Sequence, residues 1–264
     1  MPVIGIVTCQ ILELEIAHML SHDEQIDGIT VLHGDYSGGL IESLRSQDDP
    51  RLRVIGWIPE FEPSSPDRLD VLVEVVKLGL HIVIKDLKEG VTSAVREISP
   101  YVDAVMLGYG LCGNAMEKPE ELFESVDVPV FMVMDEDHIV DDCIGMLIGG
   151  RENYYEEQCK VAGTMFMTPG FVRHWKDLLH KSLGGMYDLE MSKRMLKDYE
   201  RSLLMPTGVM SLETMEEQIQ EFNELYGLRT EFREGTVDLL HKTFERVKRF
   251  VIQHGKPIHQ HVKA

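Results

Sequence analysis

Three cysteines follow predicted strands of the chain, and thiols in such positions could bind a metal or attack a substrate. Cys9 ends the apolar run PVIGIVTC, Cys112 lies in the loop GYGLCGN after VDAVML, and Cys143 follows VPVFMVM and an acidic loop. Because ligands of open parallel sheets bind beyond the carboxyl ends of the strands, the three thiols could meet at one point. Three thiolates suit zinc, or an iron–sulfur cluster with one corner open to substrate. The alternative is that they are small apolar core residues, as free Cys often is.

The loop that carries Cys112 is predicted to wrap around a ligand. Glycine permits unusual backbone angles and a close approach of the chain to a bound molecule. The residues expected to form this ligand-binding loop are Gly108, Tyr109, Gly110, Gly113 and Asn114. Cys143 is expected at the start of a helix, where backbone N–H groups lower the pKa of a thiol and favour the thiolate. Cys159 lies late in a helical pattern and is expected to be structural.

The acidic loop DEDHIVDD is a second candidate cluster. One interpretation makes His138 or Asp142 an additional ligand or an acid/base group beside the thiols. Another is a hard-cation site for magnesium or calcium, although the glycine of an EF-hand is missing and Met146 occupies the closing ligand position. The third is a solvated loop in which Asp141 or Asp142 caps the following helix.

Weaker signals lie further along the chain. Arg151 and Tyr154 could reach an anionic ligand from the helix after Cys143, with a surface role as the alternative. The C-terminal segment HGKPIHQHVKA, with His259 and His261, is expected to be a disordered tail.

The order of the predicted elements indicates the fold class. Strand-like runs at 2–9, 28–34, 51–59, 81–87, 102–108, 128–134 and 163–168 alternate with helical patterns, including 10–21, 68–80, 88–99, 143–158 and 169–182. This alternation predicts an α/β protein with a mainly parallel, Rossmann-like sheet and helices on both faces. After Leu183 the patterns are mostly helical, at 188–204, 211–227 and 236–253, with a possible edge strand at 230–235.

Two regions are therefore expected. Residues 1–183 form an α/β metal- or ligand-binding domain, and residues 184–264 form a helical cap or dimerisation region, which would allow a homo-oligomer. The length of 264 residues suits either one domain with an appendage or two small domains.

Composition excludes several kinds of partner. A formal net charge of −19 argues against binding to nucleic acid, whose phosphates require clustered Lys and Arg, and against anionic membrane surfaces. No apolar run approaches the length of a membrane span, and MPVIGIVTCQ lacks the pattern of a signal peptide. A cytoplasmic location is expected, with all four cysteines as reduced thiols.

Four segments, taken in order, carry a family resemblance: TCQILELEI, LGYGLCGN, DDCIGMLIGGRENYYEE and GTMFMTPGF. They resemble the family catalogued as domain of unknown function 1638 (DUF1638), found in methanogenic archaea and anaerobic bacteria, over roughly the first 180 residues. The resemblance implies that Cys9, Cys112 and Cys143 are the family's cysteine positions, with Asp142 beside Cys143. The chain departs from the family pattern at Asp141, where a histidine is usual, and at the phenylalanine of MTPGF, which replaces a tryptophan.

The resemblance also implies a context for function. Members of the family often occur near genes of corrinoid-dependent methyltransferases, so a corrinoid protein or a methyltransferase is the expected partner. The first hypothesis is a metal-dependent enzyme or accessory protein with thiolate-bound zinc or an iron–sulfur cluster and a possible link to methyl transfer. The second is a non-catalytic module that binds a small ligand or a partner. The third is an enzyme with a cysteine nucleophile, Cys112.

Overall fold

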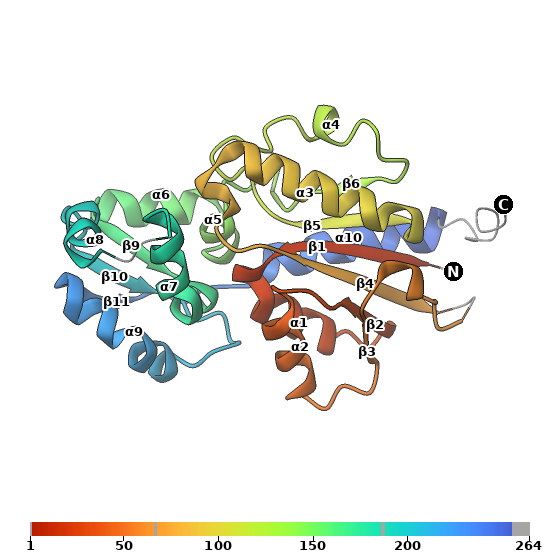
Figure 1. The fold of residues 1–264 in the computed structure, drawn as a ribbon, viewed down its shortest axis with the longest axis horizontal. Helices are drawn as coiled ribbons and strands as arrows, with labels where there is room; N and C mark the ends of the chain where they lie inside the picture. Colours follow the sequence, from red (N-terminus) through yellow and green to blue (C-terminus); the bar gives the residue numbers. More distant parts are fainter. Residues whose placement is uncertain (1, 66–67, 186–187, 255–264) are drawn as a thin grey trace.

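A parallel six-stranded sheet lies at the centre of the first of two lobes (Figure 1). The computed structural model describes residues 2–65, 68–185 and 188–254, so His259 and His261 lie outside it. The sheet has the order β3–β2–β4–β1–β5–β6. Its strands are β1 (Val3–Cys9), β2 (Ile26–Leu32), β3 (Leu52–Ile55), β4 (Leu69–Val76), β5 (Ala104–Gly108) and β6 (Val130–Phe131). All residues of β1 are buried, which explains its unbroken apolar sequence. The predicted α/β class with a Rossmann-like parallel sheet is confirmed.

Helices cover both faces of this sheet. They are α1 (Glu13–Ser21), α2 (Gly38–Arg45), α3 (Ile84–Ile98), the short α4 (Pro119–Leu122) and α10 (Asp238–His254). The β1-to-β2 and β4-to-β5 connections run in opposite directions across the sheet, so right-handed crossovers place α1 and α3 on opposite faces. The C-terminal helix α10 packs on β5 and β1, and its Lys248 forms an ion pair with Asp23 at the end of α1.

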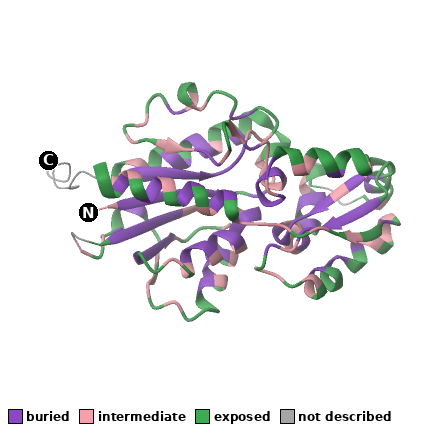
Figure 2. Ribbon diagram, turned by 180° about the vertical axis from the view of Figure 1, so that it is seen from behind, coloured by how far each residue is buried: buried purple, intermediate pink, exposed green. Residues whose placement is uncertain are grey.

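The second lobe has a small sheet and a core of its own. Strands β9 (Thr164–Met167), β10 (Arg201–Leu204) and β11 (Arg229–Phe232) pair in parallel in the order β11–β10–β9. Around them lie α6 (Arg151–Lys160), α7 (Pro169–Ser182), α8 (Leu189–Met195) and α9 (Leu212–Tyr226). Trp175 of α7 and Phe222 of α9 pack edge to face within this core. Figure 2 shows buried residues concentrated in both lobes.

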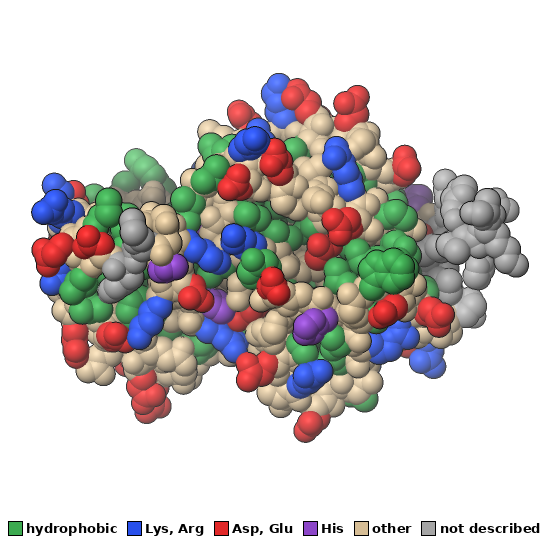
Figure 3. Space-filling model, in the orientation of Figure 1, with side chains coloured by type: hydrophobic (Ala, Val, Ile, Leu, Met, Phe, Trp, Pro, Cys, Tyr) green, Lys and Arg blue, Asp and Glu red, His purple; other side chains and the backbone are tan. Residues whose placement is uncertain are grey.

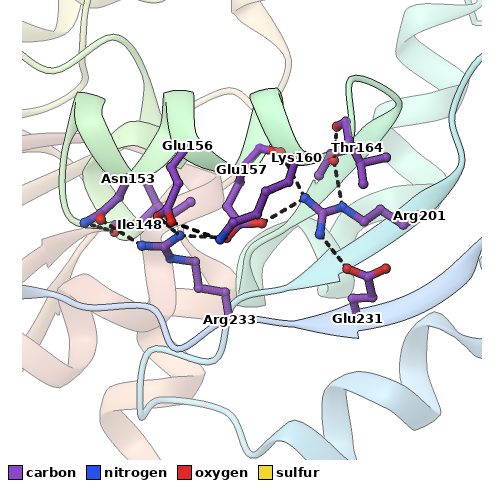
Figure 4. A network of polar contacts seen from close by, with 10 residues as sticks. Ile148, Asn153, Glu156, Glu157, Lys160, Thr164, Arg201, Glu231 and Arg233 are labelled. Atoms are coloured by element: carbon purple, nitrogen blue, oxygen red, sulfur yellow. Dashed lines mark hydrogen bonds and ion pairs between the residues drawn. The ribbon is translucent and has the colours of Figure 1, made fainter.

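An ion-pair network fixes α6 on the small sheet (Figure 4). The buried Arg201 of β10 donates to the Glu157 carboxylate at 2.8 Å and to the Thr164 hydroxyl at 2.8 Å. Arg233 donates to Glu157 at 2.7 Å and to the Asn153 side chain at 2.7 Å. Each buried charge in the network has a partner of opposite charge, which offsets the cost of burying it.

Several predicted elements differ from the structure. Residues 69–76 form β4 and not a helix, because Leu69, Val71, Leu72, Val73 and Val75 are buried on both faces of a central strand. The predicted strand at 81–87 is instead a 3₁₀ turn, Leu80–Ile82, followed by the start of α3. The predicted helix at 143–158 is two helices, α5 (Cys143–Leu147) and α6, interrupted at Gly149 and Gly150, which both have positive φ.

The region after Leu183 is also less helical than its patterns predict. Its strands β10 and β11 join β9 in the second lobe, and the predicted helix at 188–204 is only α8 followed by β10. Strand β10 is buried at all four positions, since it lies between two other strands. The edge strand predicted at 230–235 is present as β11, which is shorter and spans Arg229–Phe232. In the described part of the chain, no helix is long and apolar enough to cross a membrane.

Candidate functional site

A cavity of about 710 Å³ lies between the two lobes, at the carboxyl ends of β1, β4 and β5. The first lobe contributes Cys9, Leu78 and the loop after β5, and the second lobe contributes Thr164 to Phe166 and one side of α7. This is the position at which open parallel sheets bind ligands. The volume is in the range of sites for small molecules.

The three cysteines named from the sequence all line this cavity. Cys9 is the last residue of β1, Cys112 lies in the loop after β5, and Cys143 is the first residue of α5. Two backbone hydrogen bonds bring the last two segments together, from Leu111 N to Val140 O and from Cys112 N to Asp141 O, both 2.8 Å long. The thiols of Cys9 and Cys112, which are more than a hundred residues apart in the sequence, therefore face the same cavity.

The glycines around Cys112 allow the chain segments to approach closely. A Cβ atom added at Gly110 would lie 2.5 Å from the carbonyl oxygen of Val140, and one at Gly108 would overlap the side chain of Thr8. Cys112, Gly113 and Asn114 have positive φ angles of 45°, 68° and 66°. The loop is thus a tight turn that places Cys112 and Tyr109 at the cavity, where Gly108 and Gly113 also line it.

Burial keeps the cavity thiols in their neutral form. It raises the pKa of Cys9, raises the pKa of Cys112 to about 12, and raises the pKa of Cys143 well above the usual value. The charges of Asp142, Cys112 and Cys9 raise the pKa of Cys143 further. The expectation that a helix start would favour the Cys143 thiolate is wrong, because α5 has only five residues and its effect is smaller than that of burial and the nearby negative charge.

The hydroxyl group of Tyr109 is buried and has no hydrogen-bond partner at normal distance and angle. Its side chain is 4% exposed, and its hydroxyl oxygen makes no hydrogen bond within ordinary limits. The hydroxyl is nevertheless near the Cys9 thiol, since each group shifts the pKa of the other. A polar atom left unsatisfied in a cavity is a place where a bound molecule could supply the missing partner.

The acidic loop is divided between the cavity and the surface. Asp142 lines the cavity, caps α5 by accepting from Gly145 N at 2.9 Å, and accepts from the Tyr154 hydroxyl at 3.4 Å. Burial raises the pKa of this carboxyl group. His138 belongs to the hairpin of β7 (Met134–Asp135) and β8 (His138–Ile139), where it lies 3.5 Å from Asp135 and does not line the cavity.

Other residues named from the sequence lie elsewhere. Asp141 forms an ion pair with Arg151 at 2.9 Å, and neither residue lines the cavity, whereas Tyr154 does. Cys159 is exposed on α6, away from the other thiols. Among the described residues, no group of three or more His, Cys, Asp and Glu side chains is arranged to hold a metal ion.

His81 is a cavity residue that the sequence did not reveal. His81 lies in the turn after β4, is exposed to solvent and lines the cavity. Desolvation lowers its pKa, and the charge of Asp142 opposes that shift. The wrong assignment of residues 81–87 to a strand concealed it; a correct assignment of β4 would have placed His81 just beyond the carboxyl end of a strand.

Fold and site together define a two-lobed α/β protein with a thiol-lined cavity between the lobes. The model of the family described as "Protein of unknown function (DUF1638)" matches residues 75–244, and the chain belongs to this family. The match includes Cys112 and Cys143 but begins after Cys9, and it extends beyond the expected first 180 residues into α10. No curated protein and no solved structure is similar enough to the chain to match it.

Proposed function

We propose that the protein is a metal-binding enzyme or accessory protein whose zinc ion or iron–sulfur cluster is held by Cys9, Cys112 and Cys143. The observation that supports this most is that three thiols from distant parts of the chain face one cavity. Thiolate ligands suit both kinds of centre. The negative charge of each thiolate raises the pKa of its neighbours, and a bound cation would remove that penalty.

Binding would require the thiols to move together. In the described residues no ligand set is assembled, so the loop of Cys112 or the start of α5 must shift when the centre forms. Asp142 already accepts hydrogen bonds from Gly145 N and from Tyr154. The fourth position is therefore proposed for water or substrate, with Asp142 as an acid/base group beside it.

The cavity has room for a substrate next to such a centre. Zinc held by thiolates can activate a substrate thiol, and this chemistry would serve methyl transfer. In its narrower form the proposal links the protein to corrinoid-dependent methyl transfer in anaerobic metabolism, with a corrinoid protein or a methyltransferase as partner. That narrower form depends on the family resemblance and on no residue of the cavity.

Metal analysis of protein purified without oxygen tests the proposal. We expect about one zinc ion or one iron–sulfur cluster per chain in the wild type. Cys9→Ser, Cys112→Ser and Cys143→Ser should each remove most of this metal, whereas Cys159→Ser, which alters an exposed thiol outside the cavity, should retain it. Absence of bound metal from wild type, or equal metal content in all four variants, would contradict a thiolate centre.

A second candidate function is a module that binds a small molecule without metal or chemistry. It is favoured by the neutral state of the buried thiols and by the unassembled ligand set. In that case a triple Cys→Ser variant should fold normally and bind its ligand as the wild type does. The same high pKa values leave little thiolate near neutral pH, and they argue against a cysteine nucleophile.

A further inference from the structure

We propose that the cavity takes a small organic anion and that Lys181, together with Lys77, binds its anionic group at the edge of the cavity. This inference rests on the proposed function only in treating the cavity as a ligand site, and it requires no metal. The thiols alone would not select a negatively charged ligand such as a carboxylate, whereas the two lysines would.

Lys181 connects the two lobes next to residues that line the cavity. It lies on α7, and its Nζ donates to the carbonyl oxygen of Leu78, just after β4, at 3.0 Å. Leu78 lines the cavity, as do Leu178 and Ser182 on either side of Lys181 along α7. The ammonium group is therefore beside the cavity, with part of its hydrogen-bonding capacity still available.

The charges around Lys181 are not balanced by an ion pair. Partial burial and then the charge of Lys77 lower the pKa of Lys181, while Asp177 acts in the opposite direction. Within the described residues, neither lysine forms an ion pair with a carboxylate. Lys77 directly precedes Leu78 in the chain, whose carbonyl oxygen accepts the hydrogen bond from Lys181. A bound anion would supply the missing opposite charge.

Figure 3 shows basic side chains gathered at the junction of the lobes, on a face where acidic groups are widely spread. The charge of Lys181 lowers the pKa of Cys9, which lines the cavity. Part of the cavity wall is apolar, with Met165, Phe166 and Phe171. One small molecule could thus place its charge at Lys181, its apolar body on this wall, and its reactive end at the thiols.

Two fluorescent dyes that differ in charge test the inference. The probes are 8-anilinonaphthalene-1-sulfonate and N-phenyl-1-naphthylamine, which share a ring system but differ in the sulfonate group. We expect Lys181→Met and Lys77→Met each to weaken binding of the sulfonate dye about tenfold, the effect of losing one charge-assisted contact. Neither substitution should change binding of the uncharged dye.

Lys85→Met is the matched control, since it removes the same charge from an exposed lysine that is paired with Glu89 on α3. It should affect neither dye, and Met165→Trp, which fills part of the cavity, should weaken both. The inference is overturned if Lys181→Met and Lys77→Met change binding of the sulfonate dye no more than Lys85→Met does. It is also overturned if Lys181→Met or Lys77→Met weakens binding of both dyes equally, or if Met165→Trp changes binding of neither dye. Because metal content is measured separately, a cavity without metal that still selects the sulfonate would contradict only the metal proposal.

Discussion

The chemistry of individual residues in this protein is controlled by burial. The thiols of Cys9, Cys112 and Cys143 have raised pKa values because the charged form loses its hydration inside the cavity. A nearby cation would offset this cost and favour the thiolate. The same physical effect acts on carboxyl groups of the first lobe, and at Glu15 it leads to a measurable dependence of stability on pH.

Glu15 of α1 is fully buried, and burial raises its pKa to about 7, although the Thr207 hydroxyl donates to it at 3.0 Å. Below about pH 4.5 the carboxyl group is protonated in both the folded and the unfolded chain. As the pH rises to about 7, only the unfolded chain loses this proton, so the folded state loses about 3 kcal/mol of stability. Glu15→Gln should therefore be more stable than wild type at pH 8, with a smaller difference at pH 5.

Urea unfolding at the two pH values measures this difference. Glu24→Gln, at an exposed position of the same region, is the control and should change stability little at either pH. If Glu15→Gln and wild type differ by the same amount at pH 5 and pH 8, the carboxyl group is not protonated in the fold.

At the scale of elements, the site depends on contact between two loops. The segment 108–114 is hydrogen-bonded to residues 140–141, and this pairing places Cys112 near Cys143. Gly110 is essential to the pairing, because a side chain there would meet backbone atoms of Val140 and Asp142. Backbone atoms cannot rotate away as the end of a side chain can.

Gly110→Ala should accordingly destabilise the fold by about 1–3 kcal/mol and reduce the bound metal, because the two loops must separate. Thermal unfolding and metal analysis measure the two effects. Gly34→Ala is the matched control, since nothing lies within 4 Å of the added Cβ, and it should change neither quantity. Normal stability and metal content in Gly110→Ala would show that the loop contact is not needed.

A sequence pattern predicts an element correctly when it is compatible with only one type of secondary structure. The buried run of β1, the strand β5 and the helix α7 beginning at Pro169 were all expected, and the first two placed Cys9 and Cys112 correctly. The run at 69–76 was wrongly predicted as a helix, because an apolar segment buried on all sides has no clear period of 2 or 3.6. This error, together with the wrong assignment of residues 81–87 to a strand, also hid His81 at the cavity.

At the scale of the whole molecule, the cavity exists only because two lobes meet. The thiols come from the first lobe and the junction, whereas the apolar wall and Lys181 come from the second. Pairing of β10 with both β9 and β11 joins segments that span about 65 residues of the chain, and no local pattern specifies such pairing. From the second lobe's side of the cavity, the sequence analysis named Tyr154 but not Met165, Phe166 or Lys181.

X-ray absorption spectroscopy of anaerobically purified protein tests the central claim most directly, because it counts the atoms bound to the metal. If Cys9, Cys112 and Cys143 hold one zinc ion, the spectrum will show three sulfur ligands at about 2.3 Å; an iron–sulfur cluster will show sulfur around every iron atom. The count should fall in Cys112→Ser and stay unchanged in Cys159→Ser. A metal surrounded only by oxygen and nitrogen would contradict the claim that these thiols form a metal site.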